Sequence, residues 1–229
     1  MFDLSMKGFL DMVVAGIKVF VKSAATTNAT VPNQEPPNTE PDTSKQAAPS
    51  KPVIKVVDQP ALRPDPMASL HPNLAAFLDM IAVSELTRDL LNKSDNGYNV
   101  IVGSTPTHPH LFTSYADHPR VLVHFNNGTP PSTAAGRFQI LARFFDAYKK
   151  QLKLIDFGPE AQIKIATQMI KECKAIDDII SGNIKSAITK CSSRWASLPG
   201  GDYGQHINKV DFLVNEFTKA GGALMKMVA

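Results

Sequence analysis

A proline-rich stretch without aromatic residues divides this chain into two unequal pieces and limits what each can fold into. Nine of the 17 prolines lie between Pro32 and Pro66, and no Phe, Trp or Tyr occurs between Phe20 and Phe77. Such a segment buries too little apolar surface to offset the entropy of ordering it. We therefore expect residues 23–69 to be a disordered, semi-extended linker, with folded structure only on either side.

The piece after the linker, residues 70–229, has the size of one ordinary domain. With 43% hydrophobic and 20% charged residues, the whole chain resembles a soluble globular protein and not a disordered, collagenous or polytopic membrane protein. The formal charge of +3 is small, and all of it belongs to residues 70–229. A charge this small does not indicate nucleic acid as a partner.

The piece before the linker, residues 1–22, has the pattern of an amphipathic helix. Its longest uncharged run covers residues 12–17, whereas a membrane-spanning helix needs about 20 predominantly apolar residues. A stable span is therefore not expected. The charged residues after the first turn fall on one side of such a helix, and they are Lys7, Asp11, Lys18 and Lys22.

Three interpretations of residues 1–22 remain open. The helix could lie on the inner-membrane surface or on a partner protein. It could be a poor signal peptide or signal-anchor, with Ser23, Ala24 and Ala25 as a small-residue cleavage site, although Asp11 and Lys18 interrupt its apolar region. It could also pack on its own protein or be an extension without function.

Helical periodicity dominates the domain, so we expect an α+β fold that is mostly helical with a small β-hairpin region. In the first expected helix, apolar side chains recur at Leu74, Phe77, Leu78 and Ile81. The hairpin is expected to pair residues 98–102 with 111–115. The expected helices cover residues 72–87, 134–152, 159–173, 175–180, 184–191 and 207–220.

Glu85 continues the apolar stripe of the first helix, eleven residues after Leu74. A carboxyl group there would be partly desolvated, which raises its pKa and suits it to donate a proton near neutral pH. On pattern alone, a helix-end glutamate that points to water is the more common arrangement.

Histidines and cysteines give weaker signals. His108, His110, His118 and His124 fit no common zinc pattern, so we predict loop histidines, no metal and no cofactor. The two cysteines, Cys173 and Cys191, lie in helical patterns and are expected to be buried free thiols. A disulfide between them is the alternative in an oxidising compartment.

Two glycine-containing segments could approach a ligand. In residues 132–139, Gly136 would allow close backbone approach and Gln139 could bind amides or hydroxyls. In residues 195–205, Trp195 and Tyr203 flank a glycine-rich turn. An ordinary helix start and a core tryptophan are the alternatives.

Together these segments resemble the lambda-type phage endolysins, which are lytic transglycosylases with a lysozyme-like fold. Each string is weak alone, but six of them occur in the family's order across the domain. They are residues 77–85, 97–103, 111–120, 132–139, 146–152 and 195–205.

The resemblance implies an enzyme that cleaves the β-1,4 bond between N-acetylmuramic acid and N-acetylglucosamine in peptidoglycan and leaves a 1,6-anhydro product. Glu85 would be the catalytic acid and base, so no second carboxylate would be needed. If a lysozyme-type hydrolase is the correct alternative, Asp89, Asp95 or Asp117 would supply that carboxylate. The residues expected to bind glycan are Tyr98, Gly136, Phe138, Gln139 and Tyr203.

The chain also departs from the family, which usually has Glu-Gly-Thr where this sequence has Glu85, Leu86 and Thr87. Leu86 could crowd the cleft, which leaves a non-catalytic peptidoglycan-binding or virion structural module as a second alternative. Residues 105–110 look like an insertion, and residues 1–69 have no counterpart in compact members. We expect a monomer in the host periplasm or cell wall, tethered through residues 1–22, or a virion-associated protein.

Overall fold

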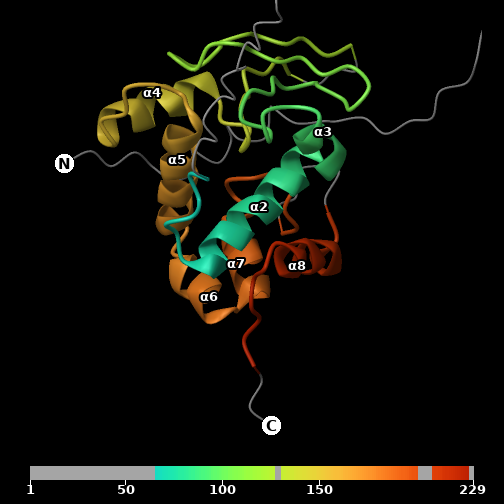
Figure 1. The fold of residues 1–229 in the computed structure, drawn as a ribbon, viewed down its shortest axis with the longest axis vertical. Coiled ribbons are helices and arrows are strands. Elements are labelled where there is room, and N and C mark those ends of the chain that lie inside the picture. The colour runs from blue at the N-terminus through green and yellow to red at the C-terminus, as the bar shows by residue number, and fades with distance from the viewer. Residues whose placement is uncertain (1–64, 127–129, 201–207, 227–229) are drawn as a thin grey trace, which may run out of the picture. The chain divides into compact units, whose positions relative to one another are not determined.

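A central helix, α2 (Pro72–Leu86), organises the computed structural model, which describes residues 65–126, 130–200 and 208–226. Helix α2 packs against α3, α5, α6 and α8, and α7 packs against α6 and α8 (Figure 1). The expected N-terminal helix and almost all of the expected linker lie outside the described residues. The other helices within those ranges are α3 (Arg88–Asn92), α4 (Ala142–Gln151), α5 (Pro159–Glu172), α6 (Ile176–Ser181), α7 (Ile184–Cys191) and α8 (Val210–Lys219).

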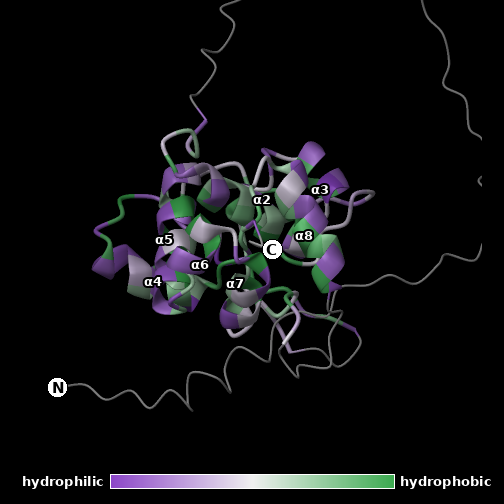
Figure 2. Cartoon of the chain, turned by 90° about the horizontal axis from the view of Figure 1, so that it is seen from below, coloured by the Kyte–Doolittle hydropathy of each residue, from purple (hydrophilic) through white to green (hydrophobic). Residues whose placement is uncertain are grey.

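The interior position of α2 follows from its sequence, which is apolar on more than one face. The predicted stripe is buried, and so are Met80, Ala82 and Val83 on other sides of the helix. A helix that is apolar nearly all round belongs inside a protein. The helices around α2 show hydrophobic and hydrophilic stretches in alternation (Figure 2).

The start of α2 is fixed by two local features. Pro72 stands in the first turn, where its missing N–H costs no hydrogen bond. The Nδ1 atom of His71 accepts a hydrogen bond of 3.2 Å from the backbone N–H of Asn73.

Among the described residues, no helix combines the length and apolar character that crossing a membrane requires.

The prediction of two regular hairpin strands is wrong, although the predicted partners do meet. Val100 and Leu111 form an isolated antiparallel bridge, flanked by a hydrogen bond of 2.9 Å from Ile101 N–H to the His110 carbonyl. A second bridge joins Ile101 to Ala135. Gly97 and Gly103 have positive φ at either end of this segment, which keeps the pairing too short for a sheet.

The predicted helix over residues 134–152 begins only at α4. Before it, the chain makes a tight turn in which Gly136 has φ +78° and Gln139 has φ +48°. Ala135 and Ile140 close this turn with two backbone hydrogen bonds, of 3.0 and 2.9 Å. Two left-handed residues three positions apart are incompatible with a helix, so the turn replaces the first two helical turns that were expected.

Candidate functional site

The last turn of α2 carries Glu85 to the place where the helix ends. Thr87 follows with φ +66°, an unusual conformation for a β-branched residue, and the chain turns there into α3. The sequence analysis did not predict α3, whose five residues are too few to show a helical period. Backbone strain of this kind clusters at functional sites.

The Glu85 side chain is partly buried, and its carboxyl group is only half satisfied. Its Oε1 atom accepts a hydrogen bond of 2.6 Å from the Ser197 hydroxyl. Its Oε2 atom is buried and has no hydrogen-bond partner among the described residues. Burial raises the pKa of Glu85 to about 7, although hydrogen bonds from the side chain and backbone of Ser197 act in the opposite direction. The group can therefore hold a proton near neutral pH and release it to a base.

Leu86, the departure from the family pattern, does not line a cleft. Its side chain is buried in the core, where its Cδ1 atom lies 2.9 Å from the position that a Cβ would occupy on Gly97. Leu86 therefore fills space beside a glycine of the following loop. The crowding of the site that the sequence suggested does not occur at this residue.

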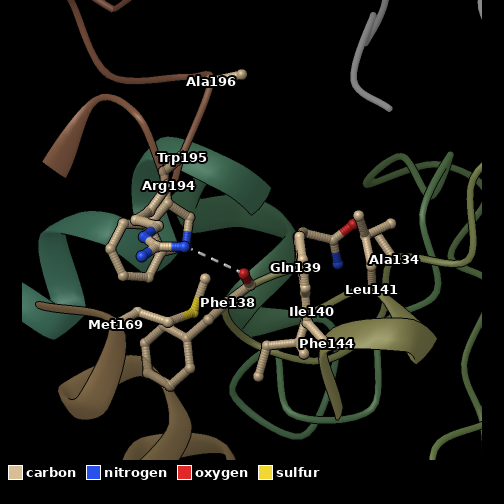
Figure 3. A pocket seen from close by; sticks show the side chains of 10 residues that line it. All are labelled: Ala134, Phe138, Gln139, Ile140, Leu141, Phe144, Met169, Arg194, Trp195 and Ala196. Atoms are coloured by element: carbon tan, nitrogen blue, oxygen red, sulfur yellow. Dashed lines mark hydrogen bonds between the residues drawn. The ribbon is translucent and has the colours of Figure 1, made fainter. Parts of the chain in front are cut away.

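A largely apolar hollow lies beside the segment that binds Glu85 (Figure 3). Within it, the Trp195 indole N–H donates a hydrogen bond of 3.2 Å to the Phe138 carbonyl. Trp195 lies two residues before Ser197, so the same short segment lines the hollow and contacts the carboxyl group. The lining residues are Ala134, Phe138, Gln139, Ile140, Leu141, Phe144, Met169, Arg194, Trp195 and Ala196.

Two of the predicted glycan-binding residues, Phe138 and Gln139, line this hollow. Phe138 is buried, and its ring packs into the core side of the hollow. Gln139 is partly exposed, and its side-chain amide donates a hydrogen bond of 3.0 Å to the Gly136 carbonyl.

Two other predicted binding residues, Tyr98 and Gly136, lie in the interior instead. The Arg137 guanidinium carbon lies 5.4 Å from the centroid of the Tyr98 ring. Burial raises the pKa of this tyrosine to about 12. The α-carbon of Gly136 faces the side chain of Gln162, whose Oε1 lies 2.2 Å from the position of a Cβ. Both residues therefore shape the turn before Phe138 from the interior side. The last predicted residue, Tyr203, lies outside the described residues.

The sequence analysis missed the polar residues that surround Glu85. Ser84, Ser197 and Asn208 form a connected hydrogen-bond group with its carboxyl, although 113 residues separate the first two. Serine and asparagine are common at helix ends and in turns, so their presence gave no signal. Ser84 and Ser197 lay within strings that carried the family resemblance, whereas Asn208 lay outside all of them.

The remaining titratable candidates have other partners. His118 is buried between aromatic rings, and its two ring nitrogens bond the Ile140 carbonyl at 2.9 Å and the Arg120 N–H at 3.0 Å. Within residues 65–126, 130–200 and 208–226, no three His, Cys, Asp or Glu side chains cluster as metal ligands do. Cys173 and Cys191 are free thiols, the first half-buried and the second buried.

Comparison with known proteins places this architecture in context. Residues 75–224 match the family described as endolysin. The endolysin of Escherichia phage lambda is 48% identical over 162 residues, which cover 70% of this chain and 99% of that protein. The endolysin of Escherichia phage P2 is 45% identical over 161 residues, covering 69% and 98%. The structure of bacteriophage lambda lysozyme complexed with a chitohexasaccharide aligns with a TM-score of 0.62 at 46% identity, over 69% of this chain and 99% of that one.

Proposed function

Because this chain belongs to the endolysin family, we propose that its domain degrades peptidoglycan as a lytic transglycosylase with Glu85 as acid and base. The bond cleaved is the β-1,4 bond between N-acetylmuramic acid and N-acetylglucosamine. Glycan as the substrate class is supported by the chitohexasaccharide bound to the related lambda lysozyme.

The observation that carries this proposal is the buried, half-satisfied carboxyl group of Glu85. A general acid is most effective when its pKa lies near the working pH. Burial brings the pKa of Glu85 to about 7, and Oε2 has no partner among the described residues that would compete for a proton. A carboxyl group in this state is suited to protonating a leaving oxygen.

In the proposed reaction, Glu85 gives its proton to the glycosidic oxygen as the bond from that oxygen to the anomeric carbon breaks. The resulting carboxylate accepts the proton of the C6 hydroxyl of the same muramic residue. The C6 oxygen then bonds to the anomeric carbon and closes the 1,6-anhydro ring. The proton count on Glu85 is restored, and no water is consumed.

Two of the three acids that a hydrolase could use as its second carboxylate, Asp95 and Asp117, have polar partners of their own. Asp117 is bound by Arg120 at 2.9 Å and by Lys149 at 3.0 Å, and these ion pairs, the Arg120 hydrogen bond first, lower its pKa to about 2. Asp95 accepts a hydrogen bond of 2.5 Å from the Tyr115 hydroxyl. Both acids are therefore held in interactions that stabilise the loop region.

The hollow lined by Trp195 and Ala196, which directly precede Ser197, is the proposed site for a sugar residue of the strand. An apolar surface lined by Phe144 and Trp195, with the Gln139 amide at its edge, suits the apolar face and the acetamido group of an N-acetylated sugar. Tyr98 and Gly136 would support this surface from inside. Tyr203 stays a predicted glycan contact.

Mass spectrometry of the products tests the proposal. Purified peptidoglycan sacculi digested with the full chain should release muropeptides that end in 1,6-anhydro-muramic acid. Products with reducing ends would instead identify a hydrolase. Binding to sacculi without soluble products would identify a non-catalytic module and overturn the proposal.

We also propose that residues 1–22 tether the enzyme to the inner-membrane surface or to a protein there, through the amphipathic pattern of the sequence. Deletion of residues 1–66 should then move the protein from the membrane fraction to the soluble fraction and delay lysis. Unchanged fractionation and lysis timing would contradict this role.

A further inference from the structure

We infer that Asn208, Ser84 and Ser197 form a one-directional hydrogen-bond chain that ends on Oε1 of Glu85 and reserves Oε2 as the oxygen that carries the catalytic proton. The three are positioning residues for a reaction whose assignment rests on the proposed function. The chain joins the end of α2, the segment after α7 and the start of α8.

The geometry of the chain is continuous. The side-chain amide nitrogen of Asn208 lies 3.0 Å from the Ser84 hydroxyl. That hydroxyl lies 2.7 Å from the Ser197 hydroxyl, which lies 2.6 Å from Glu85 Oε1. Each contact has the length of a good hydrogen bond, and the last two have that of a strong one.

The direction of the chain is fixed at Asn208. The same amide nitrogen lies 3.3 Å from the Ser84 carbonyl and 3.3 Å from the Ser197 carbonyl, which are atoms that only accept. The group facing them must be NH₂, which only donates. Ser84 therefore accepts from Asn208, and its single proton is directed to Ser197.

The same reasoning carries through to the carboxyl group. Ser197 accepts from Ser84, so its own proton points to Glu85 Oε1. If Oε1 carried the acidic proton, two protons would face each other on this short contact. The proton of the neutral acid consequently resides on Oε2, the buried oxygen without a partner among the described residues.

The chain also sets the strength of the acid. A hydroxyl that donates to a carboxylate stabilises the charged form, whereas burial destabilises it. Without the hydroxyl donor from Ser197, only the backbone hydrogen bond from Ser197 would oppose the desolvation of Glu85, and less carboxylate would be present near neutral pH to accept the C6 hydroxyl proton. The hydrogen-bond chain therefore keeps the pKa of Glu85 low enough for the base step, whereas burial keeps it high enough for the acid step.

Two variants and one control test the chain in the full-length protein. Ser197→Ala removes the last donor. Asn208→Asp replaces the donating NH₂ with an acceptor, so that Ser84 turns toward residue 208, Ser197 turns toward Ser84, and Oε1 loses its donor. Ser192→Ala is the matched control, because the Ser192 hydroxyl is also buried but donates 2.8 Å to the Thr189 carbonyl.

The readout is the titration midpoint of Glu85, measured by NMR of ¹³C-labelled carboxyl groups and assigned with Glu85→Gln, together with the pH profile of muropeptide release. Ser197→Ala and Asn208→Asp should each move the midpoint and the basic limb of the profile upward by about one pH unit, the scale of one hydrogen bond to a charged group. Ser192→Ala should leave both where they are in the wild-type protein.

The outcomes separate the chain from the enzymatic assignment. An unchanged titration midpoint of Glu85 in Ser197→Ala overturns the proposed hydrogen-bond chain, even if the wild-type protein is active. If that variant does not fold, the midpoint in Asn208→Asp decides in the same way. If the variants shift the Glu85 midpoint but the wild-type protein releases no muropeptides, the hydrogen-bond chain is supported and the proposed function is overturned.

Discussion

Helix α2 carries two acidic side chains inward, and their surroundings differ in what they leave unsatisfied. Asp79 accepts hydrogen bonds from two arginines, Arg137 and Arg88, the second at 2.9 Å. Glu85, six residues later, accepts a side-chain hydrogen bond only at Oε1 and has no ionic partner among the described residues. One acid is charged and paired, and the other is buried with its pKa raised.

The difference indicates which of the two acids contributes to the stability of the fold. Arg137 is fully buried, and besides Asp79 it binds the backbone carbonyl and the side-chain oxygen of Asn96, the latter at 2.6 Å. Breaking such a group leaves a buried charge without compensation, so it is kept for stability. Glu85 is held in a state that costs stability, which is typical of a site kept for chemistry.

The largest effect expected from this comparison is on activity. Glu85→Gln keeps the shape of the side chain but can neither donate nor accept the reacting proton. Muropeptide release from purified sacculi should fall by roughly 10³-fold, the scale of general acid–base catalysis. Asp79→Asn is the control, and its activity per folded molecule should stay near that of the wild-type protein. Comparable losses in the two variants would erase the distinction between the acids.

The converse effect is on stability. Asp79→Asn leaves the Arg137 guanidinium buried without its carboxylate, so the free energy of unfolding should fall by about 3 kcal/mol or more. Urea unfolding followed by circular dichroism measures this change. Asp89→Asn, at an exposed position of α3, should change it by less than about 0.5 kcal/mol. Equal small changes in both would mean that the Arg137 group contributes little.

The raised pKa of Glu85 should also make the stability of the fold depend on pH. Burial raises the pKa of folded Glu85 to about 7 from an ordinary 4.5, so the folded state binds one more proton than the unfolded state between these values. Stability from this group is therefore complete below pH 4.5 and is lost as the pH rises through 7, by about 3 kcal/mol in total.

Glu85→Gln removes that titration and provides the measurement. The variant and the wild-type protein should unfold with similar free energy at pH 4.5, and the variant should be more stable at pH 8. A difference that does not change between these two pH values would show that Glu85 is not buried in solution as it is in the structure.

The sequence was sufficient for what depends on local pattern. The periodicity of the first helix predicted the burial of α2 and put Glu85 at its end, and α5 and α7 begin at the expected residues, Pro159 and Ile184. The resemblance to a family then gave Glu85 a role that its pattern alone did not favour.

The sequence could not predict hydrogen bonds between side chains that are far apart in the chain. Arg137 meets Asp79 across 58 positions, and Ser197 meets Glu85 across 112. The turn before α4 was missed because Gln139 adopts a left-handed conformation that favours glycine and is rare for a residue with a side chain. Gly136 was predicted to lie at the glycan because glycine allows close backbone approach, whereas the residue that faces it, Gln162, comes from α5.

That reading of Gly136 leads to the smallest of the expected effects. The Oε1 atom of Gln162 accepts a hydrogen bond of 2.9 Å from the Arg137 N–H, and its NH₂ donates to the Tyr98 and Phe157 carbonyls at 2.9 and 2.8 Å. A side chain held by three hydrogen bonds cannot move away from a new methyl group. Gly136→Ala should therefore lower the free energy of unfolding by about 2 kcal/mol, from strain at positive φ and a disturbed hydrogen bond.

Gly221→Ala separates the two causes. Gly221 has φ +88° and no atom within 4 Å of the position of a Cβ, so this variant should lose only the conformational part, about 1 kcal/mol. The excess in Gly136→Ala measures the contact with Gln162. If Gly136→Ala instead lost activity while unfolding like Gly221→Ala, the turn would face the glycan, and the Arg137 group would belong to the site and not to the architecture alone.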